Sequence, residues 1–301
     1  MKAEVIGERA IKIIDSILSN ALLVIVVALT AFAFYALWDS NQVYSAADKS
    51  KYESYKPTDE NEGKTFKELQ AINPEVIAWL EVYGTNIDYP VTQGEDNMKY
   101  VNTNAECAYS LSGAIFLDAD NSGDFSDFNN ILHGHHMEKN KMFGEIGGFS
   151  DEKVFDSHRY GNLYYGERGH GIEFFAFVQA DAYDGSVYSP GVGKEEREAY
   201  LANLTGKALC SRDVKVTGSD RIVLLSTCST DSTNGRDILV GKITGEVFDD
   251  PFKITEKRQA FAGLYDHTGE LCLRLLALAL GLTALIVILA VAKRKTRRRQ
   301  D

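Results

Sequence analysis

The stretch from Arg221 to Ile243, RIVLLSTCSTDSTNGRDILVGKI, contains two apolar runs with a polar segment between them. The first run ends on Ser226, Thr227 and Cys228, and Arg236 opens the second run eight residues after the cysteine. Aliphatic and β-branched runs bounded by Ser, Asn and Gly predict two strands joined by a hairpin loop. Such a hairpin places Cys228 and Arg236 at the same end of a sheet.

Further short strands are predicted before this hairpin. Strand-like runs lie at residues 76–93, 113–119, 128–134 and 172–183. The clearest helix is Lys194–Ala208, which puts Tyr200, Leu201 and Leu204 on one face. A shorter helix before residue 74 is expected to have Thr65 as its N-cap. Many short strands with few helices predict a mostly β fold, built as a closed β-barrel with peripheral helices.

Two uncharged apolar runs flank this central part. Ala21–Trp38 and Leu275–Ala292 are each about 18 residues long, which is enough to cross a bilayer. The tail KRKTRRRQD follows the second run directly, and clustered Lys and Arg mark the cytoplasmic side of a membrane. Both ends of the chain are therefore predicted to be cytoplasmic, with the central domain outside the cell.

The predicted organisation has seven parts. They are a cytoplasmic tail (1–15), a transmembrane helix (16–38), a polar stalk (39–64), an external globular domain (65–250), a juxtamembrane linker (251–270), a second transmembrane helix (271–292) and a basic cytoplasmic tail (293–301). Of 32 Lys and Arg, ten lie in the tails and spans, against four of 43 Asp and Glu. The remaining net charge of about −17 argues against nucleic acid as a partner.

Cys228 is a candidate nucleophile, because a cysteine at the end of a buried strand faces a loop that substrate can reach. A catalytic thiol also needs a base and a group that stabilises charge. His135, in the segment LHGHHM, is the candidate base, and Arg236 is the candidate for the charge. The alternative is that Cys228 is a small buried hydrophobe, as most free cysteines are. Cys107 and Cys210 could pair outside the cell, although spacing does not establish such a disulfide.

Metal binding is a competing interpretation of the histidine cluster. His133 and His135 would share one face of a strand, and His136 follows directly. Two histidines and one distant thiol are an incomplete ligand set, and no CxxC or HExxH motif supports it. No metal site and no cofactor are predicted.

Three separated motifs resemble the class B sortases. Leu225-Ser226-Thr227-Cys228 with Arg236 downstream resembles the Thr-Leu-x-Thr-Cys…Arg signature of sortases, with Leu224 in the first Thr place. LHGHHM resembles the class B segment Tyr-Gly-His-Asn-Met, with His133 and His136 where the family often has Tyr and Asn. The start of the domain, INPEVIAWLEVYGTNIDYPVTQ, and GAIFLDADN also resemble class B. The similarity covers about residues 65–250, whereas the C-terminal span is more familiar from pilus-building sortases.

The resemblance implies a membrane-anchored cysteine transpeptidase with Cys228, His135 and Arg236 as its catalytic residues. Sortases cleave a Leu-Pro-x-Thr-Gly type of sorting signal between Thr and Gly and join the Thr carbonyl to an amine. The implied partners are surface proteins or pilins that carry such a signal, with a cell-wall precursor peptide or a pilin lysine as the acceptor. By the family pattern, the residues that line the peptide groove are Asn97, Val101, Ser226 and Thr227.

Three other functions remain open from the sequence. A membrane-tethered cysteine peptidase that only hydrolyses would use the same three residues. A non-catalytic surface protein would lose no activity when Cys228 is changed. The chain could also be a sortase substrate, since Thr268-Gly269-Glu270 precedes an apolar span and a basic tail. However, Tyr265 and Asp266 occupy the places of the Leu and Pro that a sorting signal needs.

Overall fold

The structure is a computed structural model that describes residues 2–58, 63–228 and 234–253. It contains four α-helices in these residues: α1 (Lys2–Ala46), α2 (Lys64–Ile72), α3 (Glu152–Ser157) and α4 (Arg197–Gly206). The strands are β1 (Val76–Val82), β2 (Asp88–Thr92), β3 (Ile115–Leu117), β4 (Asn129–His133), β5 (His136–Met137), β6 (Lys141–Met142), β7 (Tyr160–Tyr165), β8 (Arg168–Asp181), β9 (Ala208–Ser211), β10 (Arg221–Cys228) and β11 (Gly235–Ile243). The strands predicted from the sequence and the helices predicted before residue 74 and at 194–208 are present, with small shifts at their ends.

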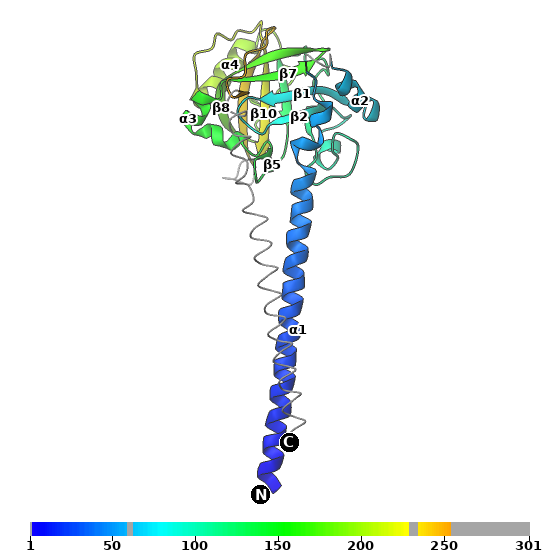
Figure 1. The fold of residues 1–301 in the computed structure, drawn as a ribbon. Coiled ribbons are helices and arrows are strands. Elements are labelled where there is room, and N and C mark those ends of the chain that lie inside the picture. Colours follow the sequence, from blue (N-terminus) through cyan, green and yellow to red (C-terminus); the bar gives the residue numbers. More distant parts are fainter. Residues whose placement is uncertain (1, 59–62, 229–233, 254–301) are drawn as a thin grey trace. The chain divides into compact units, whose positions relative to one another are not determined.

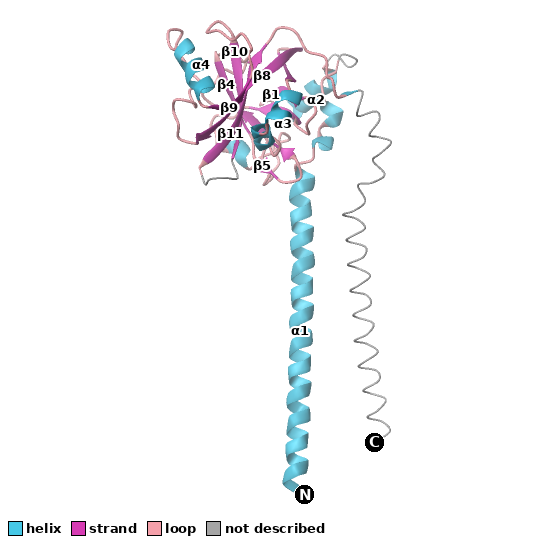
Figure 2. Cartoon of the chain, turned by 90° about the vertical axis from the view of Figure 1, so that its left-hand side faces the viewer, coloured by secondary structure: helices cyan, strands magenta, loops and turns pink. Residues whose placement is uncertain are grey.

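Eight of the strands close into a barrel, which confirms the predicted architecture. Their hydrogen-bonded order is β11-β10-β4-β3-β2-β1-β7-β8, and β8 pairs back onto β11 to complete the ring. The last strand, β9, extends from β8 outside this ring. Closure depends on the length of β8, because its first part pairs with β7 while the strand also pairs with β11 along Ile172–Asp181. Helices α2 and α4 lie on opposite sides of the barrel in both views (Figures 1 and 2).

Strand β10 is buried on both faces, which explains why its sequence is a continuous apolar run. Val223 and Leu225 belong to the main hydrophobic core, which also contains residues from β1, β2, β7 and β8. Ile222 and Leu224 point to the other face, where a second core lies beneath α4. The predicted helical face of α4, Tyr200, Leu201 and Leu204, covers this second core as expected.

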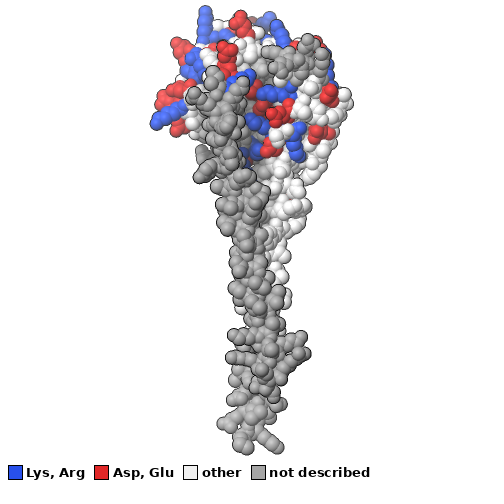
Figure 3. All heavy atoms as spheres, viewed as in Figure 1, with Lys and Arg blue, Asp and Glu red and all other residues white. Residues whose placement is uncertain are grey.

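The N-terminal helix α1 is long and apolar. Ser16–Ala46, with an apolar window of mean hydropathy 2.5, is the one helix among the described residues that is long and apolar enough to cross a membrane. Figure 3 shows acidic and basic side chains over the barrel, whereas the visible side of α1 carries neither. The second predicted span, 271–292, the basic tail and the linker beyond residue 253 lie outside the described residues.

Beyond the predicted membrane span, the chain remains helical. Helix α1 continues to Ala46, and two 3₁₀ turns follow at Lys49–Lys51 and Glu53–Tyr55. Asp48 caps the first turn by accepting a hydrogen bond from the Ser50 N–H, at 2.9 Å. The segment predicted as a stalk therefore contains helical structure as far as Tyr55.

The prediction that Thr65 caps α2 is wrong. The N-cap of α2 is Gly63, whose φ of 70° lies in the left-handed region, and no side chain caps the helix. A Cβ on Gly63 would lie 2.3 Å from the Tyr164 hydroxyl, so glycine is favoured both by conformation and by space. Thr65 instead donates a hydrogen bond to the Lys56 carbonyl, at 3.3 Å, which holds the preceding segment against the helix.

Candidate active site

Cys228 and Arg236 are direct partners across two antiparallel strands. Cys228 ends β10 and is paired with Arg236 near the start of β11, in the register that runs back to Arg221 and Ile243. Cys228 is exposed, whereas the six residues before it in β10 are buried. The predicted placement of the thiol and the guanidinium at one end of the sheet is therefore confirmed. Arg236 donates one hydrogen bond to the Gly235 carbonyl, at 2.9 Å, out of the five N–H donors in a guanidinium group.

His135 reaches the same end of the sheet from the other neighbour of β10. Strand β4 runs parallel to β10, and His133 is the register partner of Ser226. The Gly134 N–H extends this pairing by donating to the Ser226 carbonyl, at 3.1 Å. Two residues further along each strand the chain reaches His135 and Cys228, so β4, β10 and β11 bring all three predicted residues together.

The imidazole of His135 is half-buried and bonded to a backbone carbonyl. Its Nε2 lies 2.8 Å from the Val101 oxygen. A carbonyl oxygen only accepts hydrogen bonds, so Nε2 is the donor in this contact. Val101 was predicted to line the peptide groove. That role stays a prediction, whereas the structure shows its carbonyl bonded to the ring of the candidate base.

Asn97 lies at one end of a polar chain that includes a residue not singled out from the sequence. The Asn97 side-chain amide donates to Asp118 Oδ2 at 3.0 Å, and the same oxygen lies 2.9 Å from Nε2 of His133. Burial alone would raise the pKa of Asp118, but the hydrogen bonds from His133, the Asp120 backbone and Asn97, together with the His133 charge, lower it below its usual value. Asp118 therefore remains a carboxylate that fixes both neighbours.

Ser226 and Thr227 are almost inaccessible. Each has 2% of its surface exposed, and the Ser226 hydroxyl lies 2.6 Å from the Tyr188 hydroxyl. The Tyr188 ring stacks on the His133 ring, with 6.3 Å between centroids and an interplanar angle of 20°. Burial raises the pKa of Tyr188 to about 12, against smaller lowering by the Ser226 hydrogen bond and the Arg236 charge, so this side chain stays neutral. The contacts from Ser226 to Tyr188 and from Tyr188 to His133 therefore connect β10 to the Asp118 carboxylate.

Tyr188 and Asp118 were missed by sequence reasoning for different reasons. Asp118 lies within the predicted strand GAIFLDA and directly follows the observed strand β3, and a carboxylate at a strand end is a signal that could have been used. Tyr188 lies in the irregular segment between β8 and α4, where no periodicity marks a contact with β10. Its partner is 38 residues away in sequence, so only the folded chain reveals the pair.

The histidine cluster is divided among separate partners. His133 bonds to Asp118 and His135 to Val101, while Nδ1 of His136 is buried without a hydrogen-bond partner. Among the described residues, no group of three or more His, Cys, Asp or Glu side chains is placed to hold a metal ion. Cys107, Cys210 and Cys228 are all free thiols, so the disulfide that the extracellular compartment would permit is not formed in the structure.

The comparisons with known proteins agree with this geometry. No model of a known protein family matches the chain. It is 31% identical over 179 residues to sortase B of Listeria monocytogenes, covering 59% of this chain and 73% of the relative. Among solved structures, sortase B from the type II pilus of Streptococcus pneumoniae is 48% identical, with a TM-score of 0.54 over 60% of this chain and 99% of that one. A class B sortase involved in pilus biogenesis in Streptococcus pyogenes is 38% identical, with a TM-score of 0.56 over 60% and 99%.

A closed eight-stranded barrel with an exposed cysteine at a strand end and an arginine on the neighbouring strand defines a cysteine transpeptidase of the sortase type. The chain belongs to the class B sortases.

The Asp118–His133 contact generates a testable prediction about protonation. Replacing His133 with Phe removes a hydrogen bond to the Asp118 carboxylate, so we expect the pKa of Asp118 to rise. In the unchanged protein this carboxylate has a lowered pKa, so its stabilising contribution is complete above pH 3.8 and is lost as the pH falls through the lowered value. Carboxyl carbon chemical shifts followed by NMR against pH measure both values. An unchanged Asp118 pKa in His133→Phe would show that the histidine does not hold this carboxylate.

Proposed function

We propose that Cys228, His135 and Arg236 catalyse cleavage of a Leu-Pro-x-Thr-Gly-like sorting signal and transfer of the acyl group to an amine. The observation that carries the proposal is the strand register. Cys228 and Arg236 are cross-strand partners, and β4 delivers His135 to the same end of β10. Membership of a family of cysteine transpeptidases supports this assignment of the three residues.

In the first half of the reaction, Cys228 Sγ attacks the carbonyl carbon of the substrate threonine. A thiolate is the effective nucleophile, and a neighbouring cation favours that form. The guanidinium of Arg236 offers N–H donors to the tetrahedral oxyanion or to the substrate backbone. When the intermediate collapses, the bond between carbonyl carbon and nitrogen breaks, and His135 gives its proton to the leaving glycine amine. The product is a thioester on Cys228.

In the second half, an incoming amine attacks the thioester carbon. His135, now deprotonated, takes a proton from this amine, and the Cys228 thiolate leaves as the new amide bond forms. The acceptor is a pilin lysine or a cell-wall precursor peptide. The two pilus sortases among the similar structures favour the pilin amine. Product analysis with and without added amine separates transfer from simple hydrolysis.

Replacing Cys228 with Ala tests the proposal most directly. We expect the variant to lose all cleavage of a sorting-signal peptide, because the change removes the sulfur that would form the thioester beside Arg236. The change is small and lies at an exposed strand end, so the thermal unfolding temperature should stay close to that of the unchanged enzyme. Mass spectrometry of the enzyme after mixing with peptide measures the acyl adduct. Cys107→Ala and Cys210→Ala are matched controls that keep the chemistry, and more than a trace of turnover in Cys228→Ala would refute the proposed nucleophile.

Replacement of Arg236 tests whether the site needs only a positive charge or the several N–H donors of a guanidinium group. Loss of one oxyanion donor typically costs about 3–4 kcal/mol, on the order of a hundred- to thousand-fold in rate. We expect Arg236→Ala to lose at least that much in single-turnover acylation and Arg236→Lys to recover only part, because lysine supplies a compact point charge. Near-normal acylation in Arg236→Ala would move charge stabilisation to another group.

We also infer that the enzyme spans the membrane twice, with the barrel outside the cell. The apolar helix Ser16–Ala46 and the basic C-terminal sequence support this topology. Protease added to intact protoplasts should degrade the central domain and spare a tag on the C-terminus. A digested tag beside a protected central domain would reverse the proposed orientation.

A further inference from the structure

The segment that leaves α1 contacts the hairpin that directly follows His135. We call residues 43–52 the juxtamembrane segment and His136–Met142, which contains β5 and β6, the histidine hairpin. Asp48 Oδ2 and Lys141 Nζ form an ion pair at 2.5 Å. The Tyr44 hydroxyl donates to Glu138 Oε2 at 3.0 Å. The ammonium of Lys139 lies 4.2 Å from the centre of the Tyr44 ring. Asp48 and Lys141 are 93 residues apart in the sequence, and Tyr44 and Glu138 are 94 residues apart.

The histidine hairpin in turn fixes the backbone of His135. The Phe143 N–H, directly after the hairpin, donates to the His135 carbonyl at 3.0 Å. The Phe143 side chain is fully buried, and its ring lies so close to Gly134 that a Cβ there would be 2.7 Å from it. Phe143 therefore holds the backbone on both sides of the candidate base, by a hydrogen bond to His135 and by packing against Gly134. Any displacement of the hairpin is therefore passed to His135.

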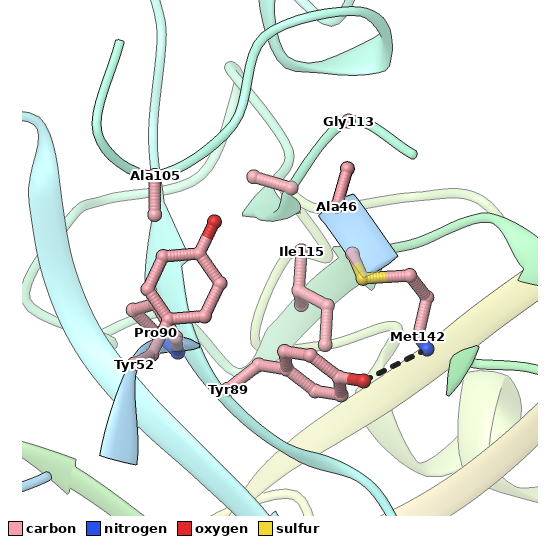
Figure 4. Close-up of a pocket in the computed structure, with 9 residues that line it drawn as sticks. Ala46, Tyr52, Tyr89, Pro90, Ala105, Gly113, Ile115 and Met142 are labelled. Atoms are coloured by element: carbon pink, nitrogen blue, oxygen red, sulfur yellow. Dashed lines mark hydrogen bonds between the residues drawn. The ribbon is translucent and has the colours of Figure 1, made fainter. Parts of the chain in front are cut away.

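A second route connects the juxtamembrane segment to the ring of His135. Ala46 and Tyr52 line a small pocket together with Ala105, Gly113 and Met142 (Figure 4). Gly113 has a φ of +58°, and a Cβ on it would lie 2.6 Å from the Val101 carbonyl, the acceptor that orients the His135 imidazole. Gly113, which approaches the carbonyl that holds the ring, thus lines a pocket with the same segment that touches the hairpin.

Tyr89 ties these two routes together. Its hydroxyl donates to the Ala47 carbonyl at 2.9 Å and accepts from the Met142 N–H at 3.2 Å, and Figure 4 shows the second bond. Ala47 is 1% exposed and Tyr52 is 5% exposed, and both side chains belong to the main hydrophobic core of the barrel. A buried hydroxyl with two backbone partners has a fixed position.

We propose that the juxtamembrane segment positions His135, with Asp48 and Tyr44 as positioning residues that act through the histidine hairpin. The membrane anchor thereby becomes part of the catalytic apparatus. The proposal rests on the proposed role of His135 as the acid and base. It predicts that breaking the contacts of the segment lowers turnover without weakening substrate binding, because neither Asp48 nor Tyr44 is among the predicted groove residues.

The Asp48–Lys141 pair is suited to such a role. Partial burial alone would raise the pKa of Asp48, but the hydrogen bonds from Lys141 and Ser50 and the Lys141 charge lower it to about 2. The pair therefore stays intact across the range in which a histidine ordinarily titrates. The side chains are 37% and 21% exposed, and pairs this accessible contribute little to global stability. A loss of turnover on breaking the pair would thus report geometry rather than unfolding.

A double-mutant cycle on the full-length enzyme in lipid nanodiscs tests the proposal. Asp48→Asn removes the charge but keeps an oxygen that can cap Ser50, and Lys141→Met removes the ammonium at similar length. We expect each single variant to lose kcat for sorting-peptide transfer about tenfold, since misplacement of a catalytic group is costly, with KM unchanged. The double variant should lose no more than either single one, because both break the same contact. Tyr44→Phe, which removes only a hydroxyl, should lower kcat in the same direction.

Ring signals of His135 in NMR spectra of isotope-labelled enzyme give a readout that does not depend on activity. We expect them to shift in Asp48→Asn and Lys141→Met, and to stay unchanged in Lys67→Met. Lys67 forms an exposed ion pair with Glu167 at 2.7 Å and serves as the matched control. Unchanged kcat and unchanged His135 signals in both variants, or losses that add in the double variant, would overturn the proposal. Absence of transfer by the unchanged enzyme would refute the proposed function instead, and the ring signals would still decide the positioning role.

Discussion

The register of β10 between a parallel and an antiparallel neighbour is the constraint on which the rest of the site depends. In this strand the exposed residue is the last one, Cys228, because both faces of the preceding run are buried in two separate cores. A slip of one residue against β11 would exchange the two faces and move apolar side chains out of both cores. The cost of that exchange locks the thiol at the strand end and Arg236 opposite it. The positions of the thiol and the guanidinium therefore depend on the burial of apolar β10 side chains that do not touch the reacting atoms.

The local parts of this arrangement were predictable from the sequence, whereas the long-range parts were not. Apolar runs and turn residues are enough to identify β10 and β11 and to place Cys228 and Arg236 together. Closure of the barrel depends on the pairing of β8 with β11, and alternation within β8 does not identify its partner. The helix cap at Thr65 failed because Gly63 supplies a left-handed conformation that the threonine signal does not reveal. Asp118 and Tyr188 acquire their partners only when β3, β4 and β10 lie side by side.

The polar chain around His133 shows how a departure from the family pattern is accommodated. Where class B sortases often have a tyrosine, this chain has an imidazole, which needs partners on both its ring face and its nitrogen. Phe116, at 5.3 Å between ring centroids, and Tyr188 lie against the ring, while Asp118 bonds to Nε2. A buried polar group without partners is costly, so the histidine is acceptable here because the carboxylate accompanies it. Asn97, by bonding to the same carboxylate, connects this adaptation to the predicted peptide groove.

The three proposed catalytic residues differ in how they are held. Cys228 and Arg236 lie within a strand ladder, where the pairing of β10 with β11 fixes the backbone at each position. His135 lies two residues past the end of β4, where the ladder has ended and loops are the least stable part of a fold. Its position must come from contacts outside the sheet, namely the Val101 carbonyl on the ring and the Phe143 N–H on the backbone. Phe143 follows the hairpin that the juxtamembrane segment contacts, and the Val101 carbonyl lies beside Gly113, which lines a pocket with that segment. On the proposed role of this segment, the base depends for its geometry on a part of the chain that a soluble barrel would not need.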